Sequence, residues 1–289
     1  MASLKEVKTK IAGVKKTAQI TKAMNMVAAA KLRGAQEKME AFRPYTEKFN
    51  EAMSNLSKGA NNTAFPLMEE RDVKVVELVV VTSDRGLCGS FNANIVKRTI
   101  KKIAEYEAEG KTVSLVCVGK KGSQLLKKTG KVRKAYREIM SNFQMFNARE
   151  IATEVSQNFI EGKCDKVEII YGRFQSVATQ VPEVAAFLPV KAIETEGESA
   201  AKISGDYIYE PSTEEIMDVL QPLYLNVCIY HAMLEVGASE HAARMTAMDN
   251  ATNACKDIVA NLTVVYNKAR QAAVTSELMD IVGGAEALK

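Results

Sequence analysis

The stretch ITKAMNMVAAAKLRG, residues 20–34, raises the first question about how this chain folds. It lacks proline, has glycine only at its end, and is rich in alanine and methionine, so it predicts an α-helix. Its apolar residues point in every direction around that helix, whereas a helix packed against one core needs a single apolar stripe. We therefore expect this helix to be covered on more than one side.

A repeat of 3.5 residues runs outward from this stretch in both directions. Counted by alternating threes and fours from Leu4 to Leu56, the positions are apolar with few exceptions. The polar exceptions are Thr21, Asn25 and Thr46. A 3.5-residue repeat of this length is typical of a coiled-coil seam. We expect Pro44 to kink the helix and the loop residues from Lys58 onward to end it.

The same repeat returns between Leu223 and Ala273. Thr213 is the expected N-cap of this second helix, and Gly283 and Gly284 are expected to end it. At 1.5 Å per residue, the two helices would be roughly 80 and 110 Å long. No globular part of this chain could cover that length, so we expect the helices to pair with each other in antiparallel order.

Between the helices the hydrophobic period changes. Residues 73–84, 112–119 and 166–172 read as strands, and residues 92–108, 120–129 and 147–161 read as helices. Residues 175–190 read as a further strand or hairpin, broken by Pro182. The predicted fold class is α/β, a long antiparallel coiled coil of N- and C-terminal helices plus a central Rossmann-like α/β domain. The predicted parts are a first helix over 1–58, an α/β domain over 70–192, an acidic connector over 193–211 and a second helix over 212–289.

Composition and charge limit the function classes. The chain has 289 residues and a net charge of only +4, but Lys and Arg dominate its first 33 residues, whereas Asp and Glu dominate residues 193–218. This asymmetry suggests oppositely charged partners at different places, or two solvated faces. Five scattered cysteines without CxxC spacing favour reduced thiols in a cytosolic compartment. The start MASLKEVKTK lacks the apolar core of a secretory signal, and no apolar run spans a bilayer, so we expect a soluble chain.

No catalytic constellation is visible. The turn VTSDRGLCGSFNANIVK, residues 81–97, has Gly86 and Gly89 as G-x-x-G, which matches neither dinucleotide nor P-loop fingerprints. His231 and His241 lack the spacing of a zinc site. We therefore expect no cofactor and no metal. Two rival interpretations stay open: an α/β-domain enzyme or nucleotide-binding protein with helical oligomerisation arms, and a basic coiled-coil nucleic-acid binder. Few aromatic residues and mixed charges in the second helix argue against the latter.

Three blocks of sequence resemble the gamma-subunit family of rotary F-type ATP synthases. They are KTAQITKAMNMVAAAKLRGAQ at 16–36, SDRGLCGSFN at 83–92, and SEHAARMTAMDNATNAC at 239–255 with VYNKARQAAVTSELMDIVGGAEAL at 265–288. The cysteine-containing redox insertion of the plant type has no counterpart here. The resemblance implies a bacterial-type central rotor shaft that is not catalytic by itself and couples ion flow to ATP synthesis, or ATP hydrolysis to ion pumping.

The resemblance also implies partners and contact residues. The partners would be the alpha and beta subunits of the catalytic hexamer, the epsilon subunit and the membrane c-ring. There would be no nucleic acid, and membrane contact would run only through the rotor ring, at the cytoplasmic face of the cell membrane. The residues implied to contact catalytic subunits are Lys22, Met24, Val27, Lys31, Arg33, Arg244, Arg270, Gln271, Thr275 and Glu277. The residues implied to form the foot on the rotor ring and epsilon are Asp206, Tyr207 and Glu210.

Overall fold

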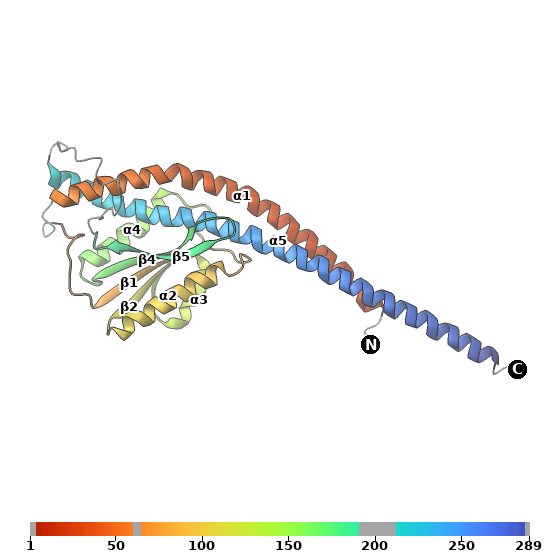
Figure 1. The fold of residues 1–289 in the computed structure, drawn as a ribbon. Helices are drawn as coiled ribbons and strands as arrows, with labels where there is room; N and C mark the ends of the chain where they lie inside the picture. Colours follow the sequence, from red (N-terminus) through yellow and green to blue (C-terminus); the bar gives the residue numbers. More distant parts are fainter. Residues whose placement is uncertain (1–3, 60–64, 191–211, 287–289) are drawn as a thin grey trace. The chain divides into compact units, whose positions relative to one another are not determined.

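The computed structural model describes residues 4–59, 65–190 and 212–286 (Figure 1). The expected foot residues Asp206, Tyr207 and Glu210, like the acidic connector, lie outside these residues. The chain divides into two compact units. One joins residues 1–29 to residues 244–289, and the other comprises residues 30–243.

Two long helices, α1 (Leu4–Gly59) and α5 (Thr213–Glu286), continue through Pro44 and Pro222 respectively. Their lengths of 56 and 74 residues correspond to about 84 and 111 Å. Every predicted seam position from Leu4 to Leu56 is buried or half-buried, and so is every one from Val227 to Ala273. The 3.5-residue seam is confirmed in both helices. At its start, Leu223 departs from it with 46% exposure.

Two expected helix ends were wrong. Gly283 and Gly284 lie inside α5, which continues to Glu286, because glycine weakens a helix by only about 1 kcal/mol. At the other end of α5, the side chain of Ser212 accepts the backbone N–H of Glu215 at 3.2 Å, so Ser212 provides the N-terminal cap in place of Thr213.

Within the unit of residues 1–29 and 244–289, the two helices pair in antiparallel order. The hydroxyl groups of Thr21 and Thr252 lie 2.7 Å apart, and the side-chain amide of Asn25 donates to the carbonyl of Met245 at 2.9 Å. Rising numbers on α1 therefore meet falling numbers on α5. The polar exceptions of the seam in this unit find each other, or a backbone carbonyl, across the pair.

The unit of residues 30–243 contains a five-stranded sheet in the order β3-β2-β1-β4-β5. Its strands are β1 (Val75–Val81), β2 (Thr112–Val118), β3 (Val132–Tyr136), β4 (Lys166–Phe174) and β5 (Gln180–Leu188). The first four are parallel, and β5 is antiparallel to β4. Pro182 lies within β5, which an edge strand tolerates. Strand β3 was not predicted from the sequence, because its segment KVRKAY (131–136) is short and polar and lies at the other edge of the sheet.

Three helices connect these strands: α2 (Phe91–Ala108), α3 (Lys120–Leu126, followed by a 3₁₀ turn at Lys127–Thr129) and α4 (Met145–Ile160). Figure 1 shows α2 and α3 on one face of the sheet and α4 on the other.

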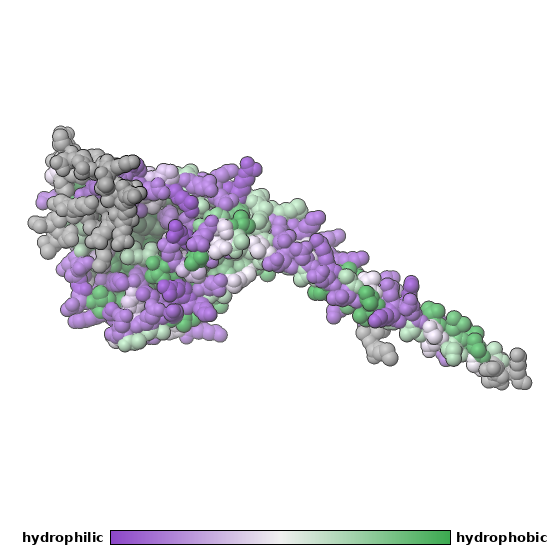
Figure 2. Space-filling model, in the orientation of Figure 1, coloured by the Kyte–Doolittle hydropathy of each residue, from purple (hydrophilic) through white to green (hydrophobic). Residues whose placement is uncertain are grey.

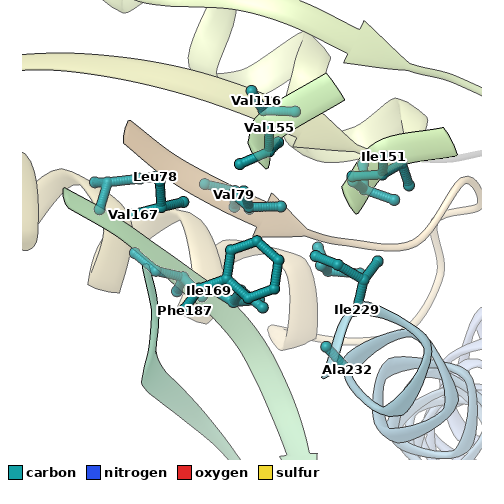
Figure 3. Close-up of a cluster of buried hydrophobic side chains, with 14 of the residues drawn as sticks. Leu78, Val79, Val116, Ile151, Val155, Val167, Ile169, Phe187, Ile229 and Ala232 are labelled. Atoms are coloured by element: carbon teal, nitrogen blue, oxygen red, sulfur yellow. The ribbon is translucent and has the colours of Figure 1, made fainter. Parts of the chain in front are cut away.

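The base of α5 belongs to the hydrophobic core of the α/β domain. Its residues Ile229 and Ala232 lie in the same buried cluster as Ile169 of β4 and Phe187 of β5 (Figure 3). The helix residues 232–240 are all buried, whereas over residues 252–285 of α5 only the seam positions are buried or half-buried. Within this unit, α5 is therefore part of the core of the α/β fold.

Candidate partner-binding surface

The carboxyl edge of the parallel sheet is where ligands bind in folds of this type. Here a carboxylate occupies the hydrogen-bond donors of that edge. Asp84, just after β1, accepts the backbone N–H groups of Lys120 at 2.8 Å, Glu138 at 3.0 Å and Met140 at 2.8 Å. A second carboxylate, that of Glu235 on α5, accepts the N–H of Phe174 at the end of β4 at 2.7 Å. Two carboxylates at this edge disfavour a phosphate, so the geometry argues against a nucleotide site.

The G-x-x-G turn after β1 has a local structural explanation. Gly89 has a φ of 57°, in the left-handed region that glycine adopts without strain. The backbone N–H of Ser83 donates to the side-chain oxygen of Asn92 at 3.1 Å. The turn therefore serves the reversal of the chain between β1 and α2, and the N–H of Ser83 is already used.

The opening stretch presents two different faces. Ala28 and Thr21, which belong to the seam, are only 2% and 9% exposed. Off the seam, Ile20 is 60%, Met26 59% and Val27 58% exposed. The antiparallel partner covers one side of this helix and leaves an apolar face uncovered, and contiguous exposed apolar surface marks an interaction site.

The last turns of α5 are exposed as well. Hydrophobic residues gather at this end of the helix in Figure 2, and those with large exposed side chains are Val274, Leu278, Met279, Ile281 and Val282. The candidate residues Arg270, Gln271, Thr275 and Glu277 lie on the same stretch and are all exposed. The hydroxyl of Thr275 donates to the carbonyl of Gln271 one turn earlier at 2.9 Å. This segment thus mixes apolar and hydrogen-bonding side chains on one accessible helix.

The remaining candidates differ in accessibility. Lys22, Lys31 and Arg33 are exposed, and Arg33 forms an ion pair with Glu37 at 3.3 Å on its own helix. Met24 is half-buried. Arg244 is only 8% exposed, so most of its side chain is covered within this chain, which differs from the exposure expected of a residue that reaches a partner.

A groove of about 270 Å³ lies within the unit of residues 30–243. Lys31 and Lys38 of α1 line one side of it, and Phe143 and Tyr230 line it with rings in edge-to-face contact at 5.8 Å. The loop of residues 140–143 and Lys38 were missed from the sequence, because α1, α5 and this loop are far apart in the chain. A basic groove with aromatic walls suits an acidic segment that also carries apolar side chains.

Among the described residues, no helix combines the length and hydrophobicity needed to cross a membrane.

Comparison with known proteins covers the whole chain. The sequence model of the family described as ATP synthase matches residues 3–288. The chain is 72% identical to the ATP synthase gamma chain of Desulfotalea psychrophila and 50% identical to that of Maridesulfovibrio salexigens, over 100% of both chains in each case.

Solved structures show the same likeness. A chain of the central stalk and c-ring structure of the Tetrahymena thermophila mitochondrial ATP synthase is 30% identical, with a TM-score of 0.61 over 80% of this chain and 99% of that one. A chain of the Euglena gracilis mitochondrial ATP synthase rotor is 22% identical, with a TM-score of 0.66 over 94% of this chain and 98% of that one, and supports the fold alone.

Proposed function

Since this chain belongs to the gamma-chain family of ATP synthases, we propose that it is the central rotor shaft of a bacterial F-type ATP synthase. It is a non-catalytic subunit, and the nucleotide chemistry takes place on its partners. The shaft turns inside the hexamer of alpha and beta subunits and drives the three catalytic sites through binding, synthesis and release in turn. A rotating asymmetric body can impose such a sequence only by contacting each site differently at each angle.

The observation that carries this proposal is the uncovered apolar face of the paired helices. Val27 on α1 is 58% exposed although its helix is paired along the seam, and Leu278 on α5, beyond the last seam position at Ala273, is 57% exposed. The stretch 20–34 is rich in alanine and methionine, and small or flexible side chains suit a surface that slides past three neighbours. A collar formed by the hexamer covers this face.

Basic and polar side chains add specific contacts to this collar. Lys22, Lys31 and Arg33 face acidic segments of the catalytic subunits, and the groove beside Lys31 and Lys38 receives the apolar side chains that flank such an acidic segment.

The side chains near the end of α5 hold a loop of a catalytic subunit. Arg270 and Gln271 supply charge-assisted and neutral hydrogen bonds to it, and Thr275 and Glu277 complete this network. Arg244 contributes only the small part of its side chain that is exposed.

The other end of the rotor meets the membrane sector. Asp206, Tyr207 and Glu210 form the foot on the c-ring and the epsilon subunit, and the chain lies at the cytoplasmic face of the cell membrane as a peripheral subunit. The solved relative from Tetrahymena thermophila is described as central stalk with c-ring, which supports this placement.

Replacing Arg270 and Gln271 together by Ala tests the proposal. Both residues are exposed, so the free subunit is expected to keep its melting temperature, whereas ATP synthesis and hydrolysis by the assembled complex are expected to fall. The matched control is Asn261→Ala, an exposed polar position nearer the middle of α5, which is expected to leave both activities unchanged. Unchanged turnover of a fully assembled double variant would contradict the assigned contacts.

A further inference from the structure

The joint between α5 and the α/β domain holds a buried carboxylate. The side chain of Glu235 is only 2% exposed. Its Oε2 accepts the backbone N–H of Phe174 at 2.7 Å, and its Oε1 lies 3.5 Å from the guanidinium of Arg43 on α1 and 3.5 Å from Nε2 of His231. One carboxylate thus connects α1, α5 and the end of β4.

A second hydrogen bond lies one turn further along α5. The hydroxyl of Ser239 donates to the carbonyl of Gly172 at 3.0 Å, and this serine is completely buried. Gly172 itself has no room for a side chain, because a Cβ there would lie 2.4 Å from the Phe91 ring of α2. Strand β4 is therefore held between α2 on one side and Ser239 of α5 on the other.

These polar contacts fix the orientation of α5 on the sheet, which the surrounding apolar contacts do only weakly. Ile229, Ala232, Met233 and Val236 of α5 are buried in the core beside them. Apolar contacts are non-directional, so they hold a helix against a sheet without fixing its rotation or its axial position strongly. A hydrogen bond to a backbone N–H fixes both, because its geometry is narrow.

Stability alone does not explain a buried carboxylate here. An apolar side chain of similar volume at such a position is often as stabilising as a buried ion pair, whereas a buried charge needs partners to avoid a large desolvation cost. Retaining Glu235 makes sense if the position of α5 on the sheet matters more than the strength of its attachment.

We propose that Glu235, assisted by Ser239, is a positioning residue that fixes the rotational register of α5 on the α/β domain and so transmits torque between the domain and the shaft. This inference rests on the proposed rotor function. The joint stiffens the rotor where the domain that receives torque meets the helix that delivers it.

The torsional stiffness of the rotor in the assembled complex tests this role. The hexamer is immobilised, a probe is attached to the α/β domain, and the thermal angular fluctuations of the stalled rotor are recorded. In Glu235→Leu and Ser239→Ala, the angular variance is expected to rise about twofold or more, because the joint then rests mainly on non-directional contacts. The matched control is Glu161→Gln, which alters a surface ion pair with Lys163 in the same domain and leaves the variance unchanged.

A local readout in the free chain accompanies this measurement. In Glu235→Leu, hydrogen exchange at the Phe174 N–H is expected to accelerate about tenfold or more, while the exchange of core amides of β1 stays unchanged. Glu235→Gln keeps an acceptor oxygen for this N–H and is expected to retain most of the wild-type exchange rate. If the leucine variant fails to fold, Glu235→Met, which is of similar length and has no acceptor oxygen, replaces it in both measurements.

The outcomes separate the two proposals. If the wild-type chain neither assembles nor rotates on ATP addition, the rotor function fails. If the wild type rotates and the angular variance of folded Glu235 and Ser239 variants equals that of the wild type, the torque-transmitting role of Glu235 is overturned. A raised variance together with faster exchange at Phe174 supports it.

Discussion

At the scale of single residues, Asp84 disfavours nucleotide binding by the α/β domain. Its carboxylate uses three backbone N–H groups at the carboxyl edge of the sheet, where a phosphate would need the same donors. A negative charge there also repels an anion.

We therefore expect the isolated chain to bind no ATP in isothermal titration calorimetry, with or without Mg²⁺. The Asp84→Asn variant removes the charge and keeps the shape, and serves as the control for repulsion alone. Micromolar binding by the wild type that Gly89→Ala abolishes would contradict this expectation and favour a nucleotide-binding domain.

His231 makes the stability of the folded chain depend on pH. Burial lowers the pKa of its ring below the ordinary 6.5, with Arg43 and Arg173 acting in the same direction and Glu235 and Glu183 opposing them. The folded state therefore holds fewer protons on this residue than the unfolded state, so stability rises with pH through this range. The contribution of His231 to stability is fully present above about pH 6.5 and is lost as the pH falls toward the lowered pKa.

Urea unfolding of the free chain at about pH 7.5 and about pH 5.5 measures this effect. The loss of unfolding free energy between the two is expected to be larger in the wild type than in His231→Gln, which cannot take up the proton. Equal losses in both proteins would show that the carboxylates alone cause the acid sensitivity.

The roles of Asp84 and Glu235 were not predictable from the sequence. Both partners of each contact are separated by tens of residues, as with Asp84 and Met140 or Glu235 and Phe174. Single residues without a local pattern give no sign that they meet. The exposed face at Val27, in contrast, followed from the repeat, because a residue that lies off the seam, next to Ala28, points partly away from the partner helix.

At the scale of elements, the repeat predicted both long helices, their pairing and their buried positions. It worked because a coiled-coil seam is a local pattern repeated over many turns. Strand β3 was missed for the opposite reason, since it forms through its pairing with β2 and has no hydrophobic pattern of its own. The ends of α5 were mispredicted for local reasons: Gly283 and Gly284 weaken a helix by only about 1 kcal/mol each, and Ser212, one residue before Thr213, provides the cap.

The polar pair in the seam permits a test at this scale. Thr21 and Thr252 share a hydrogen bond of 2.7 Å between the helices, and each hydroxyl also has a carbonyl of its own helix within reach. In a double-mutant cycle with Thr21→Val and Thr252→Val, we expect a coupling free energy of about 0.5–1 kcal/mol. The double variant is expected to be about as stable as the wild type, because two apolar groups of the same shape then meet.

Thermal unfolding followed by circular dichroism measures this cycle. Thr17→Val is the matched control, since its hydroxyl is exposed and bonds to Gly13 of its own helix. A coupling free energy near zero would mean that the two hydroxyl groups do not interact across the seam.

At the scale of the whole molecule, the chain leaves apolar side chains uncovered that a protein acting alone would bury. Val27 is 58% exposed, while its neighbour Ala28 is 2% exposed. Two adjacent residues of one helix therefore report on two different environments. Ala28 is buried in the seam against the partner helix, whereas Val27 faces the surroundings of the rotor.

Introducing Glu at each of these two positions tests that distinction. Val27→Glu is expected to change the stability of the free chain by no more than about 0.5 kcal/mol, because the new charge stays in water. Ala28→Glu is expected to lower the stability of the free chain by at least about 2 kcal/mol, because it forces a charge into the seam.

Inside the assembled hexamer, Val27→Glu is no longer harmless. Its charge then meets the apolar collar, so the variant is expected to slow ATP-driven rotation or to prevent assembly. The melting temperature of the free chain and the ATPase rate per assembled complex measure the two effects. A large decrease in the melting temperature of free Val27→Glu would mean that Val27 lies in an internal core. The hexamer would then not be needed to explain the apolar residues of 20–34.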